Sequence, residues 1–143
     1  MLAESPGHLR RRSRAFALQA LYEIDLSSHS VDGSVGWLRE EEGLPAEAFP
    51  FALQLINGVM EHRRELDELI QMLAPTWPVR YLSSIDRNIL RLALYEVKFE
   101  ADVPPKAAIN EAVELAKAFG SETTSKFVNG VMGTVMEQGD PDL

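Results

Sequence analysis

The chain has 143 residues and no cysteine, which excludes disulfide bonds and thiolate metal sites. Its hydrophobic fraction of 45% and charged fraction of 25% are those of an ordinary folded protein, and the length fits a single domain over 1–143 with flexible ends at 1–7 and 139–143. No apolar run approaches the roughly 20 residues of a membrane span, and none of signal-peptide length follows the N-terminal arginines, which favours a cytoplasmic protein.

Positive charge is concentrated near the N-terminus of an otherwise acidic chain. The formal net charge is −8, yet residues 1–14 carry +3, which leaves −11 for the remainder. The +3 combines Glu4 with four arginines, which we call the arginine cluster: Arg10, Arg11, Arg12 and Arg14. Guanidinium groups bind phosphates bidentately and stack on bases, so the cluster predicts a local anion-binding patch. The alternatives are a flexible solubilising N-terminus and a tail that pairs with the acidic body.

Helical periodicity over residues 8–26 predicts a first helix with two unlike sides. The side toward the core is expected to carry Leu9, Ser13, Phe16, Ala17, Ala20 and Ile24. The opposite side carries, along two neighbouring lines, Arg11, Leu18 and Tyr22 and then Arg12 and Gln19. This pattern predicts a basic and aromatic face, on which Tyr22 either stacks on an unpaired base or packs under a neighbouring loop. Leu18 on that face hints at a partner surface.

The middle of the chain shows loop signals followed by helical spacing. Residues 27–36 are expected to form a loop, and a short helix is expected over 37–42. Helical spacing over 46–74 predicts two helices, and Gly58 and the His62-Arg63-Arg64 group mark a possible break between them.

Capping signals delimit the remaining helices. Ser83, with Asp86 three residues on, resembles a capping box that opens a helix. The Pro-Pro pair at 104–105 ends it, Gly120 is placed to cap the next, and a last helix is expected from about Thr124. No stretch alternates with period two over strand length. The chain is therefore predicted to be an all-α, compact single-domain helical bundle of about seven helices.

The sequence lacks the common catalytic signatures. None of the phosphate-loop, dinucleotide-binding, zinc-protease or serine-hydrolase patterns occurs, and the acidic runs are expected to be solvated helix faces. His8, His29 and His62 fall in separate segments without ligand spacing, so we expect ordinary histidines, no metal site and no cofactor. Lys126 and Phe127 could add a cation and a stacking ring, although Phe127 could equally belong to the core. A binding protein without catalytic residues is predicted.

Three stretches of the chain share order and spacing with a known family: residues 10–26 (RRRSRAFALQALYEIDL), 85–96 (IDRNILRLALYE) and 103–131 (VPPKAAINEAVELAKAFGSETTSKFVNGV). Together they resemble the NusB family of bacterial transcription antitermination factors. The third stretch is the most specific, because its INEA, ELAK and KFVNG segments appear in family order. The region from Trp37 to Trp77 is similar only in its helical pattern.

The resemblance implies a compact seven-helix fold and a regulatory role. In the family, NusB pairs with NusE, a small-subunit ribosomal protein, and binds boxA RNA in a complex with transcribing RNA polymerase. That complex suppresses premature termination, notably in ribosomal RNA operons, and is linked to ribosome biogenesis. No cofactor is implied. We expect a boxA-type RNA to be bound as a single strand, because its bases are then within reach of side chains.

By position, the resemblance implies an RNA-binding surface formed by Arg10, Arg11, Arg12, Arg14, Gln19, Tyr22, Lys126 and Phe127. Asp86 falls where the family has an acidic residue near the NusE and RNA surfaces, although its capping role alone accounts for an acid there. Two departures affect the expected RNA affinity and loop shape. Thr123 and Thr124 replace acidic or polar residues, and Pro105 follows Pro104 where another residue is usual.

Three alternatives stay open. The fold could serve as a protein-docking or ribosome-assembly module without sequence-specific RNA binding. A small enzyme is motivated only by the many carboxylates and by Tyr22 near Arg11. Some relatives form homodimers that could cover the arginine face, so a homodimer is a further state that the sequence leaves undecided.

Overall fold

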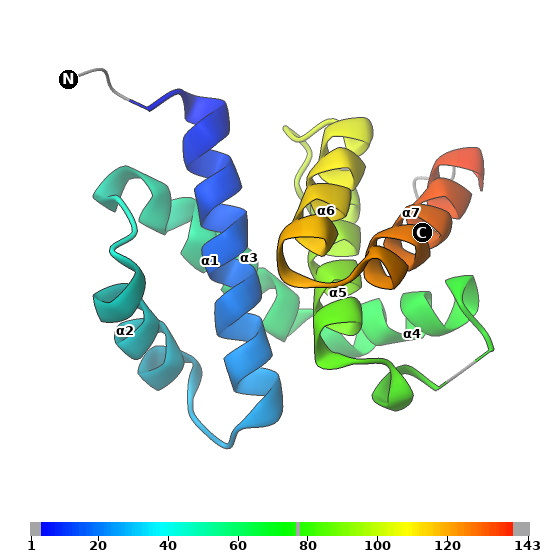
Figure 1. Cartoon of the computed structure of the whole chain (residues 1–143), viewed down its shortest axis with the longest axis horizontal. Helices are drawn as coiled ribbons and strands as arrows, with labels where there is room; N and C mark the ends of the chain where they lie inside the picture. The colour runs from blue at the N-terminus through cyan, green and yellow to red at the C-terminus, as the bar shows by residue number, and fades with distance from the viewer. Residues whose placement is uncertain (1–3, 77, 139–143) are drawn as a thin grey trace. The chain divides into compact units, whose positions relative to one another are not determined.

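Every regular element in the described part of the chain is helical (Figure 1). The computed structural model describes residues 4–76 and 78–138. Its α-helices are α1 (Pro6–Leu26), α2 (Val31–Glu42), α3 (Phe49–Glu61), α4 (Arg63–Leu73), α5 (Ser84–Phe99), α6 (Pro105–Phe119) and α7 (Glu122–Gln138). Two 3-10 turns accompany them, η1 (Ala46–Ala48) and η2 (Val79–Tyr81). The prediction of an all-α fold with about seven helices is confirmed. Among the described residues, no helix has the length and apolar character needed to cross a membrane.

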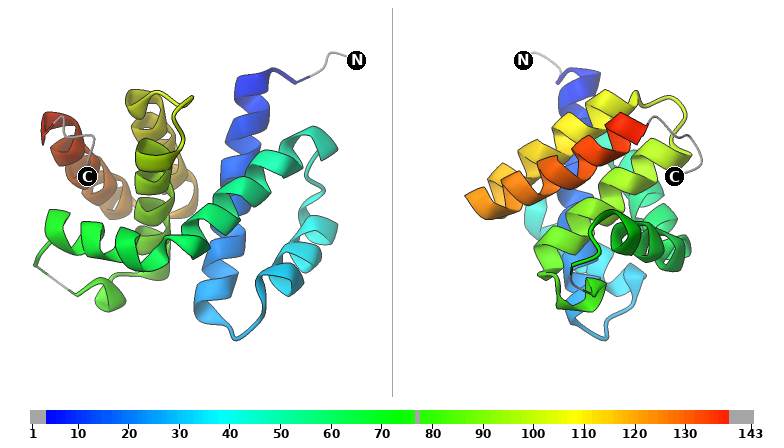
Figure 2. Two further views of the ribbon diagram at one scale, coloured as in Figure 1. Left: turned by 180° about the vertical axis from the view of Figure 1, so that it is seen from behind. Right: turned by 90° about the vertical axis from the view of Figure 1, so that its right-hand side faces the viewer.

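The helices form two compact units, Met1–Gly58 and Val59–Leu143, which we call the N-terminal and C-terminal units and describe separately. In the N-terminal unit, α1 and α2 pack together in opposite directions, and η1 contacts α1 (Figure 2). In the C-terminal unit, α5 and α6 lie side by side and antiparallel, α7 packs against α6, and α4 packs against α5. Each unit thereby buries the apolar sides of its helices.

Helix α2 begins at Val31, so the predicted loop over 27–36 is wrong in its second half. The N-cap residue Ser30 accepts a hydrogen bond from the Gly33 amide at 3.0 Å and starts the helix ahead of the glycines that had indicated a loop. The other end is as predicted. Gly43 has a φ of 61°, the left-handed conformation that glycine adopts without steric cost.

Three boundary signals in the second half of the chain act as caps or breaks. His62 separates α3 from α4, at one of the two predicted break points. Ser83 opens α5 as predicted, since its Oγ accepts a hydrogen bond from the Asp86 amide at 3.1 Å. Pro105 occupies the first turn of α6 after the N-cap Pro104, where a missing amide hydrogen costs nothing. The second proline therefore starts a helix and does not disturb the loop before it.

The connection between α6 and α7 is short and tightly packed. Gly120 is the C-cap of α6, as predicted, and its φ of −110° is open to any residue. Space is the restriction, because a Cβ atom on Gly120 would lie 2.6 Å from the Thr124 Cβ and Cγ2 atoms. Thr124 is buried, and its amide donates to the Ser121 Oγ at 3.2 Å. Because Ser121 thereby caps the helix, α7 begins at Glu122, slightly earlier than predicted. Glycine therefore allows α7 to follow α6 at close range.

A buried ion pair joins α4 to α5. Arg91 on α5 is 4% exposed, and its Nε and Nη2 atoms donate to the two carboxylate oxygens of Asp67 on α4, at 2.7 and 3.0 Å. Arg91 Nη1 also donates to the Asn88 Oδ1 at 3.0 Å, and the Asn88 amide donates to the Ser84 carbonyl oxygen at 2.8 Å. A bidentate pair fixes both distance and orientation, so this network sets how α4 lies on α5.

We expect Gly120→Ala to lower the free energy of unfolding by about 1–3 kcal/mol, because the added methyl group overpacks the α6–α7 connection. Urea unfolding followed by far-UV circular dichroism measures the change. Gly36→Ala is the matched control, because a Cβ atom at this position in α2 would meet nothing within 4 Å. Alanine should raise the stability there by about 0.5–1 kcal/mol. Equal effects at the two positions would contradict the packing argument.

Candidate nucleic-acid interface

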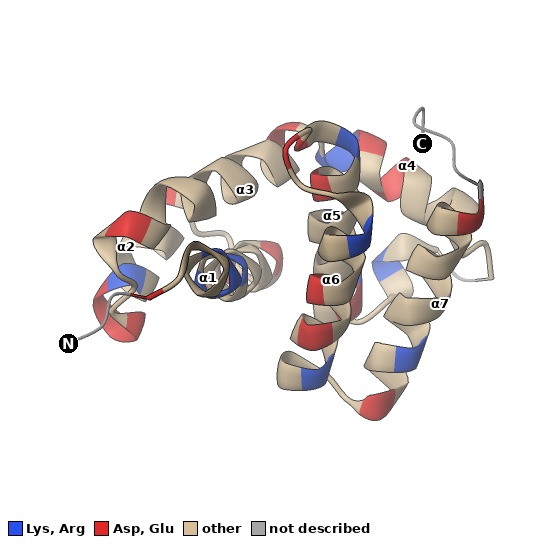
Figure 3. Ribbon diagram, turned by 90° about the horizontal axis from the view of Figure 1, so that it is seen from above, with Lys and Arg blue, Asp and Glu red and all other residues tan. Residues whose placement is uncertain are grey.

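One side of α1 carries a line of polar and aromatic side chains. At 100° per residue they fall within an arc of roughly 100°, and we call them the α1 stripe: Arg11, Arg12, Gln19 and Tyr22. Arg11 is exposed and Tyr22 is 38% exposed, while Arg12 and Gln19 are half-buried. Figure 3 shows basic residues on the first turns of α1 and acidic residues on α2. The predicted basic and aromatic side of the first helix is thus one continuous stripe.

Two members of the α1 stripe are held by weak contacts. Arg12 pairs with Glu4, which precedes the helix, and the two side chains are 37% and 33% exposed. The same Glu4 carboxylate lies 3.3 Å from the His8 Nε2 atom. The Gln19 side-chain amide donates to the Ala15 carbonyl oxygen at 3.3 Å. An exposed ion pair contributes only about 0–1 kcal/mol, so a phosphate can replace the Glu4 carboxylate at little cost.

The other two arginines of the cluster lie against an aromatic ring. The Cζ atoms of Arg10 and Arg14 are 4.3 and 5.5 Å from the ring centre of Phe51 on α3, in cation–π contact. Arg14 is only 6% exposed, and Arg10 is half-buried. The Ser13 Oγ atom donates to the Ala48 carbonyl oxygen at 2.7 Å and anchors the same part of α1. The arginine cluster therefore consists of an accessible pair on the α1 stripe and a packed pair over Phe51.

Leu18 does not belong to an exposed surface. It is 1% exposed, so the hint of a partner surface at this position is wrong. The buried side of α1 is wider than the sequence pattern indicates and comprises Ser13, Arg14, Phe16, Ala17, Leu18, Ala20, Leu21 and Ile24. Leu9, which was expected in the core, is half-buried. The exposed large apolar side chains of α1 are Tyr22 and Leu26.

The remaining predicted RNA-binding residues lie on α7, in the C-terminal unit. Lys126 is 77% exposed at its side chain, and its Nζ atom lies 3.3 Å from Glu122 one turn earlier. Phe127 is half-buried and precedes the fully buried Val128. The ring of Phe127 is thus partly accessible, and each unit offers a cation beside an aromatic side chain.

Asp86 lies in the first turn of α5, where its amide is capped by Ser83. Its Oδ1 atom is buried and has no hydrogen-bond partner among the described residues. Buried acceptors are rarely left unpaired, so this oxygen could accept a hydrogen bond from another molecule. At the departure from the family pattern in α7, Thr124 is 7% exposed and its hydroxyl lies 3.3 Å from that of Ser121, while Thr123 is exposed.

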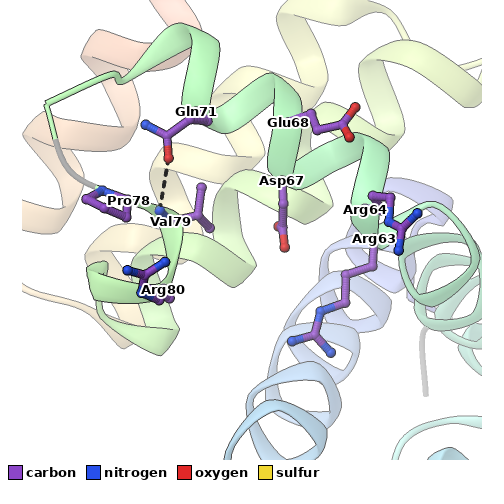
Figure 4. A pocket seen from close by; sticks show the side chains of 8 residues that line it. All are labelled: Arg63, Arg64, Asp67, Glu68, Gln71, Pro78, Val79 and Arg80. Atoms are coloured by element: carbon purple, nitrogen blue, oxygen red, sulfur yellow. Dashed lines mark hydrogen bonds between the residues drawn. The ribbon is translucent and has the colours of Figure 1, made fainter.

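A further group of cations was missed by the sequence analysis. Arg63, Arg64 and Arg80 line one pocket of the C-terminal unit, between α4 and η2 (Figure 4). In the sequence, Arg63 and Arg64 marked only a helix break, and no local pattern predicts that they lie near Arg80. The packing of η2 on α4 brings them together.

The chemistry of these surfaces suits an anionic polymer. Arginine donates to phosphate oxygens, glutamine can bind base edges, and tyrosine can stack on an unpaired base. Within residues 4–76 and 78–138, no three His, Asp or Glu side chains come together in a group that could hold a metal ion.

Known proteins match the chain over nearly its full length. Residues 11–137 match the model of the NusB family. The transcription antitermination protein NusB of Herpetosiphon aurantiacus is 43% identical over 145 residues, which cover 99% of this chain and 99% of the relative. The structure of T. maritima NusB has a TM-score of 0.83 and 33% identity, covering 94% of this chain and 93% of that one. A structure of the antitermination factors NusB and NusE in complex with dsRNA has a TM-score of 0.83 and 26% identity, covering 92% of this chain and 98% of the matched chain.

The helical fold and the extent of these matches define a non-enzymatic regulator of transcription. The chain belongs to the NusB family. The family resemblance of the three sequence stretches is thereby confirmed, together with the prediction that the chain is not an enzyme.

We expect the Arg10 and Phe51 side chains to be energetically coupled. In a double-mutant cycle of Arg10→Gln and Phe51→Leu, the coupling energy should be about 0.5–1 kcal/mol, because leucine keeps apolar volume but removes the negative face of the ring. Urea unfolding of the four proteins gives the value. Additive effects within error would show that the guanidinium over Phe51 contributes nothing to stability.

Proposed function

We propose that this chain is a transcription antitermination factor that binds boxA-type RNA together with NusE, as part of the RNA polymerase antitermination complex. Its task is then to suppress premature termination in ribosomal RNA operons and to assist ribosome biogenesis in the cytoplasm. Membership of the NusB family supports the regulatory role. The α1 stripe is the observation that supports RNA binding, because it places two cations, an amide and a ring along one accessible line.

In this proposal the α1 stripe divides its work between phosphates and bases. Arg11 and Arg12 bind phosphates, with Arg12 exchanging Glu4 for the RNA backbone. Gln19 donates to and accepts from a base edge, and Tyr22 stacks on an unpaired base. Phosphate contacts supply affinity and base contacts supply sequence preference, so both are needed to distinguish boxA from other RNA.

The packed arginines have a supporting part in the same proposal. Arg10 and Arg14 hold the first turns of α1 against Phe51 and add positive potential beside the stripe. On the C-terminal unit, Lys126 and Phe127 offer a second phosphate contact and a second ring. In this proposal the buried Arg14 contributes to RNA affinity without contacting the RNA.

NusE is proposed as the protein partner because the related structure contains NusB with NusE. The unpaired Oδ1 atom of Asp86 is a candidate acceptor for a NusE donor. That related structure also contains dsRNA. We nevertheless infer single-stranded binding here, because the rings of Tyr22 and Phe127 can stack only on bases that are not paired.

A second candidate function is a protein-docking or ribosome-assembly module without sequence-specific RNA binding. It is favoured by the exposed apolar side chains of the N-terminal unit, since Leu26 and Trp37 are each 58% exposed. The same side chains could meet a second copy of the chain in a homodimer. Light scattering over a concentration series tests the homodimer, and a monomeric mass throughout excludes it.

We expect Arg11→Glu/Arg12→Glu to weaken the binding of a labelled single-stranded boxA-type RNA by at least about tenfold, because two phosphate contacts are replaced by repulsion. The slope of log affinity against log salt should fall by about 0.7 for each phosphate that the variant no longer binds. Fluorescence anisotropy at several salt concentrations, with and without NusE, provides both values.

The matched control is Lys106→Glu/Lys117→Glu, which makes the same charge change at two exposed positions of α6. It should change the affinity by less than the stripe variant and leave discrimination against a scrambled RNA intact. If both variants weaken binding equally, only the net charge matters and the α1 stripe is not the interface. Equal affinity of the wild type for boxA and scrambled RNA would favour the docking function.

Replacement of Tyr22 tests the stacking role separately. Tyr22→Ala should weaken RNA binding by about fivefold or more, because loss of a base–aromatic stack costs about 1–3 kcal/mol. Tyr22→Phe keeps the ring and should bind nearly as well as the wild type. Equal losses in the two variants would assign the effect to the hydroxyl group instead.

A further inference from the structure

The pocket between α4 and η2 has a volume of about 630 Å³, which is enough for a nucleotide-sized group. Arg63 and Arg64 line it from α4, and Arg80 lines it from η2 (Figure 4). The acidic side chains that share the lining are Asp67 and Glu68. In a chain with a net charge of −8, three arginines around one pocket form an unusual local excess of positive charge.

The carboxylates near the pocket are largely committed to other cations. Asp67 forms the buried bidentate pair with Arg91, so its charge is neutralised from the α5 side. Glu65 accepts a hydrogen bond from the Lys98 Nζ at 2.8 Å, which is the main cause that lowers the pKa of Glu65. Of the two lining carboxylates, Glu68 is the one outside the pair with Arg91, and the exposed Arg64 and Arg80 outnumber it. The pocket therefore keeps a positive charge.

Stability does not account for Arg64 and Arg80. Arg63 and Arg64 stand in the first turn of α4, where the helix dipole disfavours cations by about 0.3–1 kcal/mol each. The N-cap residue His62 makes no side-chain capping hydrogen bond that would offset them. Arg64 and Arg80 are exposed, and neither forms an ion pair in the part of the chain that the structure describes. Their position is better explained by an anionic ligand.

An exposed aromatic ring adjoins the pocket. Tyr81 is 67% exposed, and the Arg80 Cζ atom lies 4.9 Å from its ring centre. The turn that bears both residues is fastened to α4, because the Gln71 Oε1 accepts a hydrogen bond from the Val79 amide at 3.2 Å (Figure 4). A cation beside an exposed ring on a fixed turn is the arrangement that binds a phosphate and an adjacent unpaired base.

We propose that the α4–η2 pocket is a second RNA site, in which Arg64 and Arg80 bind the phosphate backbone and Tyr81 stacks on a base. The inference rests on the proposed RNA-binding function and extends it to residues outside the three family-like stretches of the sequence. An unpaired RNA segment fits better than an acidic peptide, because a carboxylate ligand would leave Tyr81 without a stacking partner. The site would bind nucleotides other than those bound on α1.

The test compares two labelled single-stranded RNAs, a minimal boxA-type RNA and the same RNA extended at both ends by unstructured nucleotides. Arg64→Glu/Arg80→Glu should weaken binding of the extended RNA by about tenfold. The slope of log affinity against log salt should fall by about 1.4, for two phosphate contacts at about 0.7 each. Tyr81→Ala should weaken binding of the extended RNA by about fivefold or more, whereas Tyr81→Phe should bind it nearly as well as the wild type. The variant Lys106→Glu/Lys117→Glu is again the control for net charge.

Thermal unfolding separates binding from folding. Arg64→Glu/Arg80→Glu should melt at or above the wild-type temperature, because a carboxylate suits the first turn of α4 better than a guanidinium does. A lower melting temperature with a matching loss of RNA binding would mean that the arginines are structural, which overturns the proposal.

The outcomes also separate this site from the α1 stripe. If only the α1 variant loses binding, the α1 stripe stands and the α4–η2 site is wrong. If only the pocket variant loses binding, the α4–η2 site stands and the α1 stripe is not the interface. A pocket variant that binds RNA normally but loses NusE would reassign the pocket to protein carboxylates. If the wild type binds neither RNA, with or without NusE, both proposals fail.

Discussion

The ion pair between Arg91 and Asp67 is the interaction on which the arrangement of the C-terminal unit depends. The Arg91 side chain is 4% exposed and that of Asp67 is 30% exposed, so loss of the carboxylate would leave a buried guanidinium charge uncompensated. By fixing α4 on α5 the pair also fixes the place from which Arg63 and Arg64 reach the pocket. The pair thus engages Asp67, one of the two carboxylates that line the pocket, while Arg64 is exposed beside it.

In the N-terminal unit, an aromatic ring lies against two of the clustered arginines. The ring of Phe51 contacts the guanidinium groups of Arg10 and Arg14, and its quadrupole attracts these cations. Arg11 and Arg12 can then occupy the solvent side of α1 while the packed pair still contributes to the potential around them. A small basic region is maintained in this way on a chain whose overall charge repels bulk nucleic acid.

Local signals account for most of what could be predicted from the sequence. The Ser83 cap and the Gly43 terminus need only neighbouring residues, and the α1 stripe follows from helical periodicity. The width of a helix's buried side depends on how many neighbours it meets, which its own periodicity does not reveal, so Leu18 was misplaced. The packing of Arg14 on Phe51 and the α4–η2 pocket join residues distant in the sequence. Such contacts exist only once the helices are assembled.

The ion pair between Arg12 and Glu4 gives the chain an internal competitor for its own ligand. Because the carboxylate is tethered eight residues from the arginine, its effective concentration at that site is in the millimolar range or above. Because the exposed pair is worth only about 0–1 kcal/mol, the carboxylate competes weakly with a stray phosphate, and an RNA held at several points delivers its phosphates at a comparable effective concentration. The tether thus gives a modest advantage at Arg12 to an RNA that is also held elsewhere over a lone phosphate, and this advantage comes from a single exposed ion pair.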